Sequence, residues 1–498
     1  MALNLGIGGV TRHACAALSD DRQVLGVCEQ ERITRARGAG CDSTGLPGAA
    51  LDALLGTLGR TRASIDACAV AEDVPQAASW PIVKLEHHEG HASAAYLTSP
   101  FDAATILICD HGVPGVTVWQ GRGREIARID WPWRGVGFAD LYAECARILG
   151  FGSEGGDQRF EALARMMSAD PDTRVPPLFR ACPNELHVAS GWQDRALASV
   201  ASATSDVPAR ARLAAALQQH IANAVLEVLG AIQAHAPSRH LCLGGSLFHH
   251  SAINSAVRNS GMFDRVFIPA NPGNAGVAVG AAMRISKLAP TNLSAFMGPL
   301  YDPDETKATL DNCKLRYDWL DEGAAVQTAV HHLQQGRLVG WFEGRMEWGP
   351  RALGARSILA NPFSPYVLEN LNRFLKRREA WRGYALCAPD EDVRAHFDGP
   401  AEAPFMECDF RPRDAARFRP VMPSPAAHLR VQTVTADCPR GFRAVLGAFG
   451  KATGISCLVN TSFNGFHEPI VCTPRDAVRV FFGSGLDVLV LDRFVLTK

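Results

Sequence analysis

The 498-residue sequence lacks the features of several protein classes. Lys and Arg total 50 and Asp and Glu total 51, so no excess of one charge indicates a nucleic-acid or membrane partner. The first residues do not form a basic region followed by an apolar one, and no apolar stretch reaches the roughly 18 to 20 residues that span a bilayer. These absences favour small-molecule partners and predict a soluble cytoplasmic protein.

Paired cysteine motifs are also absent. The 14 cysteines, for example Cys15, Cys109, Cys242 and Cys457, lie scattered and mostly in apolar runs, and no two form a CxxC pair. That pattern favours reduced, buried thiols over a disulfide framework or a structural zinc site. Repeats and low-complexity tracts are missing too. Because chains split into domains beyond about 250 to 300 residues, two or three domains are expected.

The order of apolar runs and turns predicts an α/β protein. Short strands at 3–10, 14–18 and 23–27 open the chain, and a strand at 103–109 ends at Asp110. Three prolines within 289–304 predict a linker that separates a domain at 1–288 from a domain at 305–498. Further elements are expected at 209–235, 322–335, 365–377 and 476–484 as helices and at 113–120, 338–342, 456–459 and 488–491 as strands.

Glycines follow one predicted strand and precede one predicted helix of the first domain. Gly244 and Gly245 follow the strand at 240–243, while Gly273 and Asn274 precede a small-residue helix at 277–286. Such positions expose backbone N–H groups to an anion, although plain turns use the same residues. These four residues are therefore candidates for nucleotide binding.

Two histidines form a candidate metal site. His87 and His91 lie four residues apart in EHHEGHASAAY and share one helical face, whereas His88 points elsewhere. Such a pair is often a coincidence, but Asp110 adds a carboxylate at the end of an apolar strand, where a charge needs a cation or hydrogen bonds. Two imidazoles and a carboxylate suit Fe(II), Mn(II) or Zn(II), with coordination positions left open.

The stretch GWFEGRMEWGPRALGARSILA at 340–360 is the most informative part of the chain. It places Arg345, Arg351 and Arg356 among glycines and a proline. Guanidinium groups pair bidentately with phosphate or carboxylate, and glycine lets the backbone approach a ligand closely, so the stretch predicts an anion site.

Further basic and polar residues follow in the second domain. Lys376, Arg378 and Arg382 in KRREAWRGY are anion ligands or complement a helix end. The segment LVNTSFNGFHEPIV predicts that 460–464 is either a ligand-binding loop or a helix cap. Arg430 alternates with Gln432 in HLRVQTV and is expected on one face of a strand.

These segments together resemble the ATP-dependent antibiotic and nodulation O-carbamoyltransferases, the family of the tobramycin, cephamycin and ansamycin carbamoylating enzymes. The resemblance is carried by GRMEWGPRALGARSIL, KRREAWRGYA, RVQTV, LVNTSFNGFHEPIVCTPRDA, EQERITR, HHEGHASAA and LCLGG. It implies an N-terminal domain of the actin-like, sugar-kinase superfamily (ASKHA), similar to the tRNA threonylcarbamoyl-transferring enzymes, followed by a YrdC-like α/β domain. In that family the YrdC-like domain makes carbamoyl-adenylate from carbamoyl phosphate and ATP. The N-terminal domain then transfers the carbamoyl group to an acceptor beside bound iron.

The resemblance also implies roles for particular residues. The catalytic set would be His13, Arg345, Arg351, Lys376 and Arg378. Carbamoyl phosphate and Mg-ATP would be bound by Arg345, Arg351, Arg356, Lys376, Arg378, Arg382, Arg430, Ser462 and Asn464. The metal ligands would be His87, His91, Asp110 and Asn274, with Fe(II) favoured over Zn or Mn. The acceptor would be a hydroxyl or an amine of a small-molecule natural product, and a homodimer is one expectation.

The first half departs from the family pattern at several positions. GNAG places Asn274 where the pattern has an aspartate that completes the metal shell, and a neutral amide is the weaker ligand. HGVPG follows Asp110, and QRFEALA replaces a lysine-containing GKVMGLA segment. His13 stands for an aspartate and His249 for an asparagine, so either could serve as a base or an additional ligand.

The departures leave two alternatives to a complete carbamoyltransferase. The first is a protein that forms carbamoyl-adenylate while its N-terminal domain is a degenerate, non-transferring docking module. The second is a related transfer that uses another acyl donor.

Overall fold

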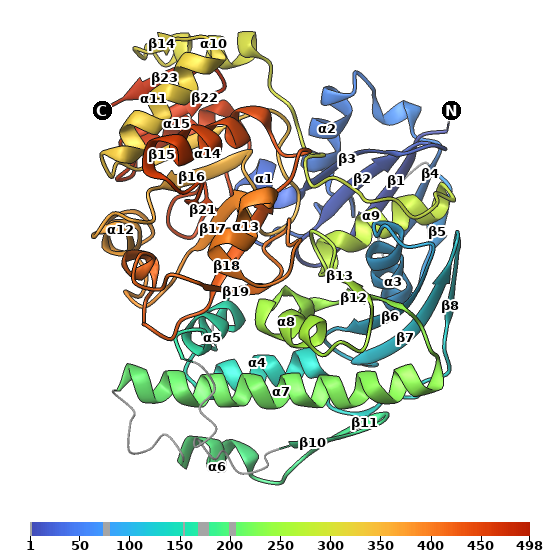
Figure 1. Cartoon of the computed structure of the whole chain (residues 1–498). Helices are drawn as coiled ribbons and strands as arrows, with labels where there is room; N and C mark the ends of the chain where they lie inside the picture. Colours follow the sequence, from blue (N-terminus) through green and yellow to red (C-terminus); the bar gives the residue numbers. More distant parts are fainter. Residues whose placement is uncertain (1, 73–79, 153–154, 168–178, 199–205) are drawn as a thin grey trace.

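A computed structural model describes residues 2–72, 80–152, 155–167, 179–198 and 206–498. The C-terminal half, yellow to red in Figure 1, packs against an N-terminal half that runs from blue to green. Helices and strands alternate throughout, which confirms the α/β class. Among the described helices, none combines the length and the apolar character that crossing a bilayer requires.

Two five-stranded sheets form the N-terminal half and share one arrangement. Their strands are β1 (Asn4–Gly8), β2 (Cys15–Ser19), β3 (Val24–Glu29), β4 (Ala67–Val70) and β5 (Ile82–Lys84), and β6 (Ala103–Cys109), β7 (Val116–Arg122), β8 (Glu125–Arg128), β12 (His240–Gly244) and β13 (Arg265–Phe267). The orders are β3-β2-β1-β4-β5 and β8-β7-β6-β12-β13. In each sheet the central strand pairs antiparallel with one neighbour and parallel with the other. This duplicated sheet is the arrangement of actin-like, sugar-kinase-type proteins, as predicted.

Strand β6 is buried on both faces, which explains its continuous apolar sequence. Leu107 and Cys109 belong to a core with the long helix α7 (Val207–His235) and with α4 (Phe138–Ile148). The alternating residues Ile106 and Ile108 face a second core, because successive side chains of a strand point to opposite sides. The end of β6 is thereby held between two packed layers, and Asp110 follows it directly.

Helices α3 (His87–Leu97) and α9 (Asn274–Ile285) cross at very short range. A Cβ atom on Gly280 would lie 2.4 Å from the carbonyl oxygen of Gly90 and 2.5 Å from the backbone nitrogen of Ala94. Gly280 therefore lets the backbones of the two helices touch. Since α3 packs on β6 and β12 while α9 packs on β1, the crossing joins the two sheets.

The C-terminal half is built on one ten-stranded sheet. Its strands are β14 (Asp318–Trp319), β23 (Phe494–Thr497), β22 (Val488–Leu491), β15 (Val339–Phe342), β16 (Arg356–Ala360), β21 (Leu458–Ser462), β17 (Ala385–Pro389), β20 (Leu429–Val434), β19 (Asp409–Pro412) and β18 (Phe397–Asp398), in that order across the sheet. One face packs on α11 (Glu322–Gln334) and α14 (Arg440–Thr453), and the other packs on α15 (Pro474–Phe482).

Three element predictions need correction. The predicted strand at 456–459 is β21, which runs on to Ser462, so the first half of the predicted polar loop is strand. Asn460 tolerates burial there because its Nδ2 donates to Ala352 O and Gln432 Oε1. The predicted helix at 365–377 is divided into α12 (Val367–Glu369) and a π-helical turn at Asn370–Leu375. β22 is not the closing strand, because β23 follows it.

Residues 286–302 connect the two halves without forming a helix or strand. The connection is tied to the C-terminal half: Trp348 N donates to Ala295 O at 2.8 Å and Met346 N donates to Pro299 O at 3.0 Å. Trp348 also packs in an apolar cluster with residues of the N-terminal half. We propose that the domain division lies in this connection, with 1–288 and 305–498 on either side.

The crossing of α3 and α9 yields a stability prediction. Gly280→Ala should lower the free energy of unfolding by about 1 to 3 kcal/mol, because the added methyl group meets backbone atoms that cannot rotate away. Gly56→Ala is the matched control: Gly56 is an exposed residue of helix α2 (Gly48–Thr57), and a Cβ there has no neighbour within 4 Å. Urea unfolding of both variants measures the difference. Equal midpoints for the two variants would contradict the close crossing.

Candidate functional site

Three of the predicted metal ligands converge on one point. The Nε2 atoms of His87 and His91 each lie 3.0 Å from Asp110 Oδ2, and they lie 3.2 Å from each other. His88 turns away, and its Nδ1 contacts Thr117 Oγ1 at 2.8 Å. The predicted shared helical face is confirmed, and the three ligand atoms are close enough to hold one metal ion.

Further contacts orient these ligands. His91 Nδ1 lies 3.1 Å from Pro272 O, and Asp110 Oδ1 accepts hydrogen bonds from the backbone N–H of Ser246 at 2.9 Å and from its hydroxyl. Burial raises the pKa of Asp110, but the charge of His91 and hydrogen bonds from His87, His91 and Ser246 hold that pKa well below its usual range. The carboxylate is thus ionised and ready to bind a cation, and its partners fix the orientation of the ligands.

Asn274 supplies a fourth candidate ligand. It is the first residue of α9, two positions after Pro272, and its Oδ1 is buried without a hydrogen-bond partner. An unpaired buried oxygen is costly unless a cation or water fills its lone pairs. The two imidazole nitrogens and the carboxylate fit a divalent cation, and that donor set is compatible with Fe(II), Zn(II) or Mn(II), while the part of Asn274 as a further ligand stays a prediction.

The predicted glycines pack around this centre. Gly245 N donates to Pro272 O at 2.7 Å, and Gly245 has a φ of +96°. A Cβ on Gly245 would lie 2.3 Å from Cys109 O, and a Cβ on Gly273 would lie 2.5 Å from His249 Nε2. Gly245 is therefore required by close packing against the backbone of Cys109, whereas a Cβ on Gly273 would push against the movable ring of His249. Nucleotide binding by Gly244, Gly245, Gly273 and Asn274 stays a prediction.

The two histidines that depart from the family pattern lie in different surroundings. His249 is largely buried, and burial together with the charge of Arg351 lowers its pKa to about 3, so it is neutral at pH 7. Its backbone carbonyl accepts a hydrogen bond from Arg351 Nη2 at 3.4 Å. His13 is exposed in the turn between β1 and β2 and has a φ of +60°.

Three residues that were predicted to bind carbamoyl phosphate and ATP, Lys376, Ser462 and Asn464, contact one another. Lys376 Nζ contacts four oxygens: Ser462 O at 2.5 Å, Ser462 Oγ at 3.5 Å, Asn464 Oδ1 at 2.5 Å and Asn464 O at 3.2 Å. All four acceptors are neutral. Burial, followed by the charge of Arg378, lowers the pKa of Lys376 well below its usual value. An anion beside this ammonium would supply the missing negative charge.

Arg378 and Arg382 lie beside Lys376 and add positive charge. The Arg378 guanidinium stacks over the Tyr384 ring at 4.2 Å, and its Nε donates to Asn372 Oδ1 at 3.1 Å. Burial, together with the charge of Arg378, lowers the pKa of Arg382 to about 10. The structure therefore brings the KRREAWRGY cations together with Ser462 and Asn464.

Arg351 and Arg430 meet at the boundary of the two halves. Burial lowers the pKa of each of these two guanidinium groups. The positive charges of Arg351 and Arg165 lower the pKa of Arg430 further. Arg430 Nη1 is buried without a partner. A small cavity next to it is lined in part by Arg165, Tyr384 and Arg430.

The remaining two predicted arginines are bound to backbone oxygens. Arg345 donates to Gly298 O, Leu25 O and Met297 O. Arg356 is fully buried, stacks on the Phe342 ring at 3.5 Å and donates to carbonyls of residues 343, 344, 355 and 472. The structure does not bring them into the group around Lys376, and their contact with phosphate stays a prediction.

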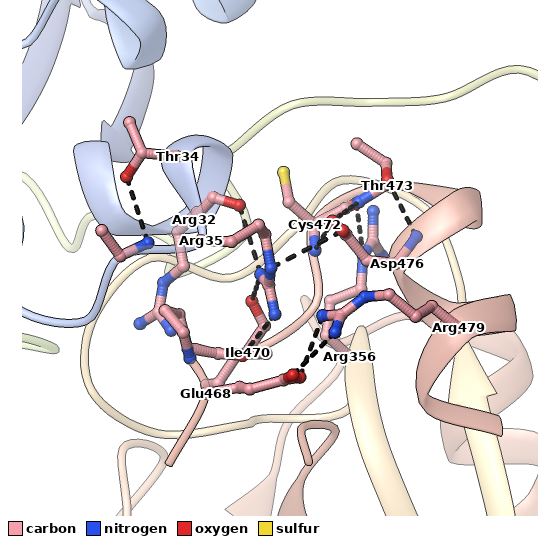
Figure 2. Close-up of polar contacts among 12 residues, drawn as sticks. Arg32, Thr34, Arg35, Arg356, Glu468, Ile470, Cys472, Thr473, Asp476 and Arg479 are labelled. Carbon is pink, nitrogen blue, oxygen red and sulfur yellow. Dashed lines mark hydrogen bonds and ion pairs between the residues drawn. The ribbon is translucent and has the colours of Figure 1, made fainter. Parts of the chain in front are cut away.

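Two charged groups at the domain boundary were missed as sites from the sequence. Glu161 and Asp409 both bind Arg165, at 2.6 and 3.1 Å. Arg32 and Arg35 of the EQERITR motif reach across to the C-terminal half, as Figure 2 shows for Arg35. The sequence held a signal for Arg32 and Arg35, because the charged residues Glu31, Arg32 and Arg35 follow the buried strand β3 closely.

Two family models match most of the chain. The model of the carbamoyltransferase N-terminus matches residues 62–283, and the model of the carbamoyltransferase C-terminus matches residues 330–498. Nodulation protein NolO of Bradyrhizobium diazoefficiens is 30% identical over 444 residues, covering 83% of this chain and 79% of that protein. The uncharacterized protein sll1178 of Synechocystis is 29% identical over 475 residues, covering 84% of this chain and 76% of its own length.

Solved structures resemble the chain more distantly. Full-length HypF in its phosphate- and nucleotide-bound form covers 57% of this chain and 55% of that chain, with 12% identity and a TM-score of 0.37. The activator of 2-hydroxyisocaproyl-CoA dehydratase from Clostridium difficile covers 57% of this chain and 94% of that chain, with 14% identity and a TM-score of 0.37. These scores are low, so the fold assignment rests on the strand order.

The ligand geometry predicts how metal content responds to substitution. His91→Ala should reduce bound Fe(II), Zn(II) or Mn(II) by about tenfold or more, because it removes a nitrogen from the centre. Asn274→Asp should raise affinity by about tenfold, because a carboxylate replaces a neutral oxygen. Elemental analysis after dialysis against each metal measures both effects. His331→Ala is the control, because His331 is an exposed residue of α11, and unchanged metal content in His91→Ala would contradict the assignment.

Proposed function

The chain belongs to the carbamoyltransferase family, and from that premise we propose a two-step reaction. In the first step the C-terminal, YrdC-like half makes carbamoyl-adenylate from carbamoyl phosphate and Mg-ATP. In the second step the N-terminal half transfers the carbamoyl group to a hydroxyl, or an amine, of a small-molecule natural product. The observation that carries the proposal is the buried ammonium of Lys376, whose four hydrogen-bond contacts with Ser462 and Asn464 are all to neutral oxygens.

The charge of the first-step substrates explains the cations. Carbamoyl phosphate and ATP bring several negative charges together, so their reaction needs positive groups that reduce repulsion and stabilise the leaving pyrophosphate. Lys376, Arg378 and Arg382 supply such groups beside Ser462 and Asn464. Arg351 and Arg430 extend the positive surface to the domain boundary, and the amide and hydroxyl groups orient the phosphates.

Atoms balance in the first step when one water is consumed. Water releases inorganic phosphate from carbamoyl phosphate and leaves carbamate. A carbamate oxygen then attacks the α-phosphorus of ATP, and the bond to the β-phosphate oxygen breaks as pyrophosphate leaves. The product is carbamoyl-adenylate, so one phosphate and one pyrophosphate form for each turnover.

The second step forms a bond between the acceptor oxygen, or nitrogen, and the carbamoyl carbon, while the bond from that carbon to the adenylate oxygen breaks and AMP leaves. A divalent cation held by His87, His91, Asp110 and Asn274 would polarise an oxygen of the donor. The acceptor must lose a proton to a base. We assign that role to His13, with neutral His249 as the other candidate within the same region.

The docking-module alternative is not favoured. Its premise is that the N-terminal half has lost its centre, yet His87, His91 and Asp110 still converge within hydrogen-bond distance and Asp110 is held ionised. Both family models match the chain, including the one for the N-terminal half. The changes at Asn274 and His249 alter the centre without dispersing it.

Pyrophosphate release tests the first step. Purified protein should release pyrophosphate only when ATP and carbamoyl phosphate are both present, and Lys376→Met should lower the rate by at least about a hundredfold, since it removes a cation from the reacting phosphates. Lys307→Met is the matched control, because Lys307 is an exposed lysine of helix α10 (Pro303–Asn312) that pairs with Asp311 at the surface. Release that needs no carbamoyl phosphate would sink the proposal, as would full activity of the Lys376 variant.

A further inference from the structure

Arg35 joins the N-terminal half to a loop of the C-terminal half. It ends the short helix α1 (Gln30–Thr34) in a left-handed conformation, with φ +61°, which turns the chain and its side chain toward the other half. Its Nη1 donates to Ile470 O at 2.6 Å and its Nη2 donates to Pro469 O at 2.7 Å (Figure 2). Two adjacent carbonyl oxygens are thus held by one planar, rigid group.

The same loop is held from its other side by the start of α15. Asp476 Oδ2 accepts hydrogen bonds from the backbone N–H groups of Cys472 and Thr473, at 3.2 and 3.0 Å. Thr473 Oγ1 accepts a hydrogen bond from Asp476 N, which completes a capping box. Asp476 Oδ1 also lies 3.6 Å from Arg35 Nε. Asp476, which holds the N–H groups of the loop, and Arg35, which holds its carbonyls, therefore lie beside each other (Figure 2).

The held loop, residues 464–472, leads directly to Lys376 and the oxygens around it. Glu468 precedes the two held carbonyls, and its own backbone oxygen accepts a hydrogen bond from Asn464 Nδ2 at 2.6 Å. The opposite end of that amide, Asn464 Oδ1, contacts Lys376 Nζ at 2.5 Å and Ser462 Oγ at 2.8 Å. A shift of the loop would therefore rotate the Asn464 amide and move the ammonium of Lys376.

Arg35 differs from Arg165 and Arg258, two other arginines at the domain boundary. Those two reach carboxylates, Asp409 at 3.1 Å and Glu407 at 3.2 Å, and Arg258 also donates to Glu402 O at 2.7 Å. Arg35 instead places its strongest hydrogen bonds on backbone oxygens of one loop. Its contacts determine the shape of that loop more directly than they determine the association of the halves.

We propose that Arg35 is a positioning residue for the donor: it fixes the loop at 464–472 and thereby holds Asn464 and Lys376 for binding of carbamoyl phosphate and ATP. The proposal rests on the proposed function, because it assigns the donor to that pocket. It also gives the N-terminal half a part in the first step, so the adenylate pocket is complete only while the two halves are joined.

The full-length chain allows a direct test. Arg35→Gln should raise the KM for carbamoyl phosphate in pyrophosphate release by about ten- to a hundredfold, because a small misplacement of binding groups is costly. Arg35→Lys should recover part of the loss, since an ammonium reaches the same carbonyls without the planar fork. Asn464→Ala should raise the KM similarly, and the double variant should be no worse than either single variant, because both changes act on one path.

Arg258→Gln is the matched control, because it breaks another contact between the halves at a distance from the loop. Hydrogen exchange provides the second readout: amides of 464–472 should exchange faster in the Arg35→Gln variant than in the Arg258→Gln variant. If Arg35→Gln is unstable, the Arg35→Lys variant carries the same two measurements. Additive losses in the double variant, equal KM changes for Arg35→Gln and Arg258→Gln, or unchanged loop exchange would each overturn the proposal. Wild-type protein that releases no pyrophosphate would instead overturn the proposed function and this inference with it.

Discussion

The ion pair of Arg165 with Asp409 joins the two halves of the molecule, and Glu161 of the N-terminal half pairs with the same guanidinium. All three groups are largely removed from water, and breaking one member of such a buried set costs about 3 to 5 kcal/mol, because a charge is left uncompensated. Asp409 lies opposite Arg430 in the pairing of β19 with β20. The ion pair that joins the halves therefore involves the direct neighbour of Arg430, an arginine of the proposed donor site. Separating the halves would disturb the surroundings of that arginine.

The surroundings of Asp110 and those of Lys376 differ in the sign of their charge. Around Asp110 the negative charge is matched by imidazoles and a hydroxyl, and one neutral oxygen at Asn274 is left over. Around Lys376 positive charge accumulates among neutral oxygens, and the lowered pKa values of Lys376 and Arg382 express the cost of that accumulation. The first centre is suited to a cation and the second to anions, which is the division of labour that a two-step carbamoyl transfer requires.

Much of this arrangement follows from local sequence patterns. The spacing of His87 and His91 and the apolar run before Asp110 were sufficient to predict that these three side chains could share one site, because a helical repeat and a strand end are local properties. The polar run after Leu458 was misleading: Asn460 is polar yet lies in a central strand, where its Nδ2 donates to Ala352 O and Gln432 Oε1. The sequence predicted Arg345 and Arg356 as anion ligands, yet carbonyl oxygens accept their hydrogen bonds. For Arg345 these oxygens belong to residues 25, 297 and 298, and for Arg356 they belong mainly to residues 343, 344 and 355. The partners of Asn460 and Arg345 are far apart in the chain, and a single sequence does not show them.

The contact of Gly280 with the backbone of α3 has a mechanical consequence. Because no side chain separates α3 from α9, the helix that carries the two histidines and the helix that begins at Asn274 cannot slide or spread without breaking that contact. The residues of the candidate metal site on α3 and α9 must therefore move together as one rigid unit. Any movement around these residues has to come from other segments, because the two helices move only together.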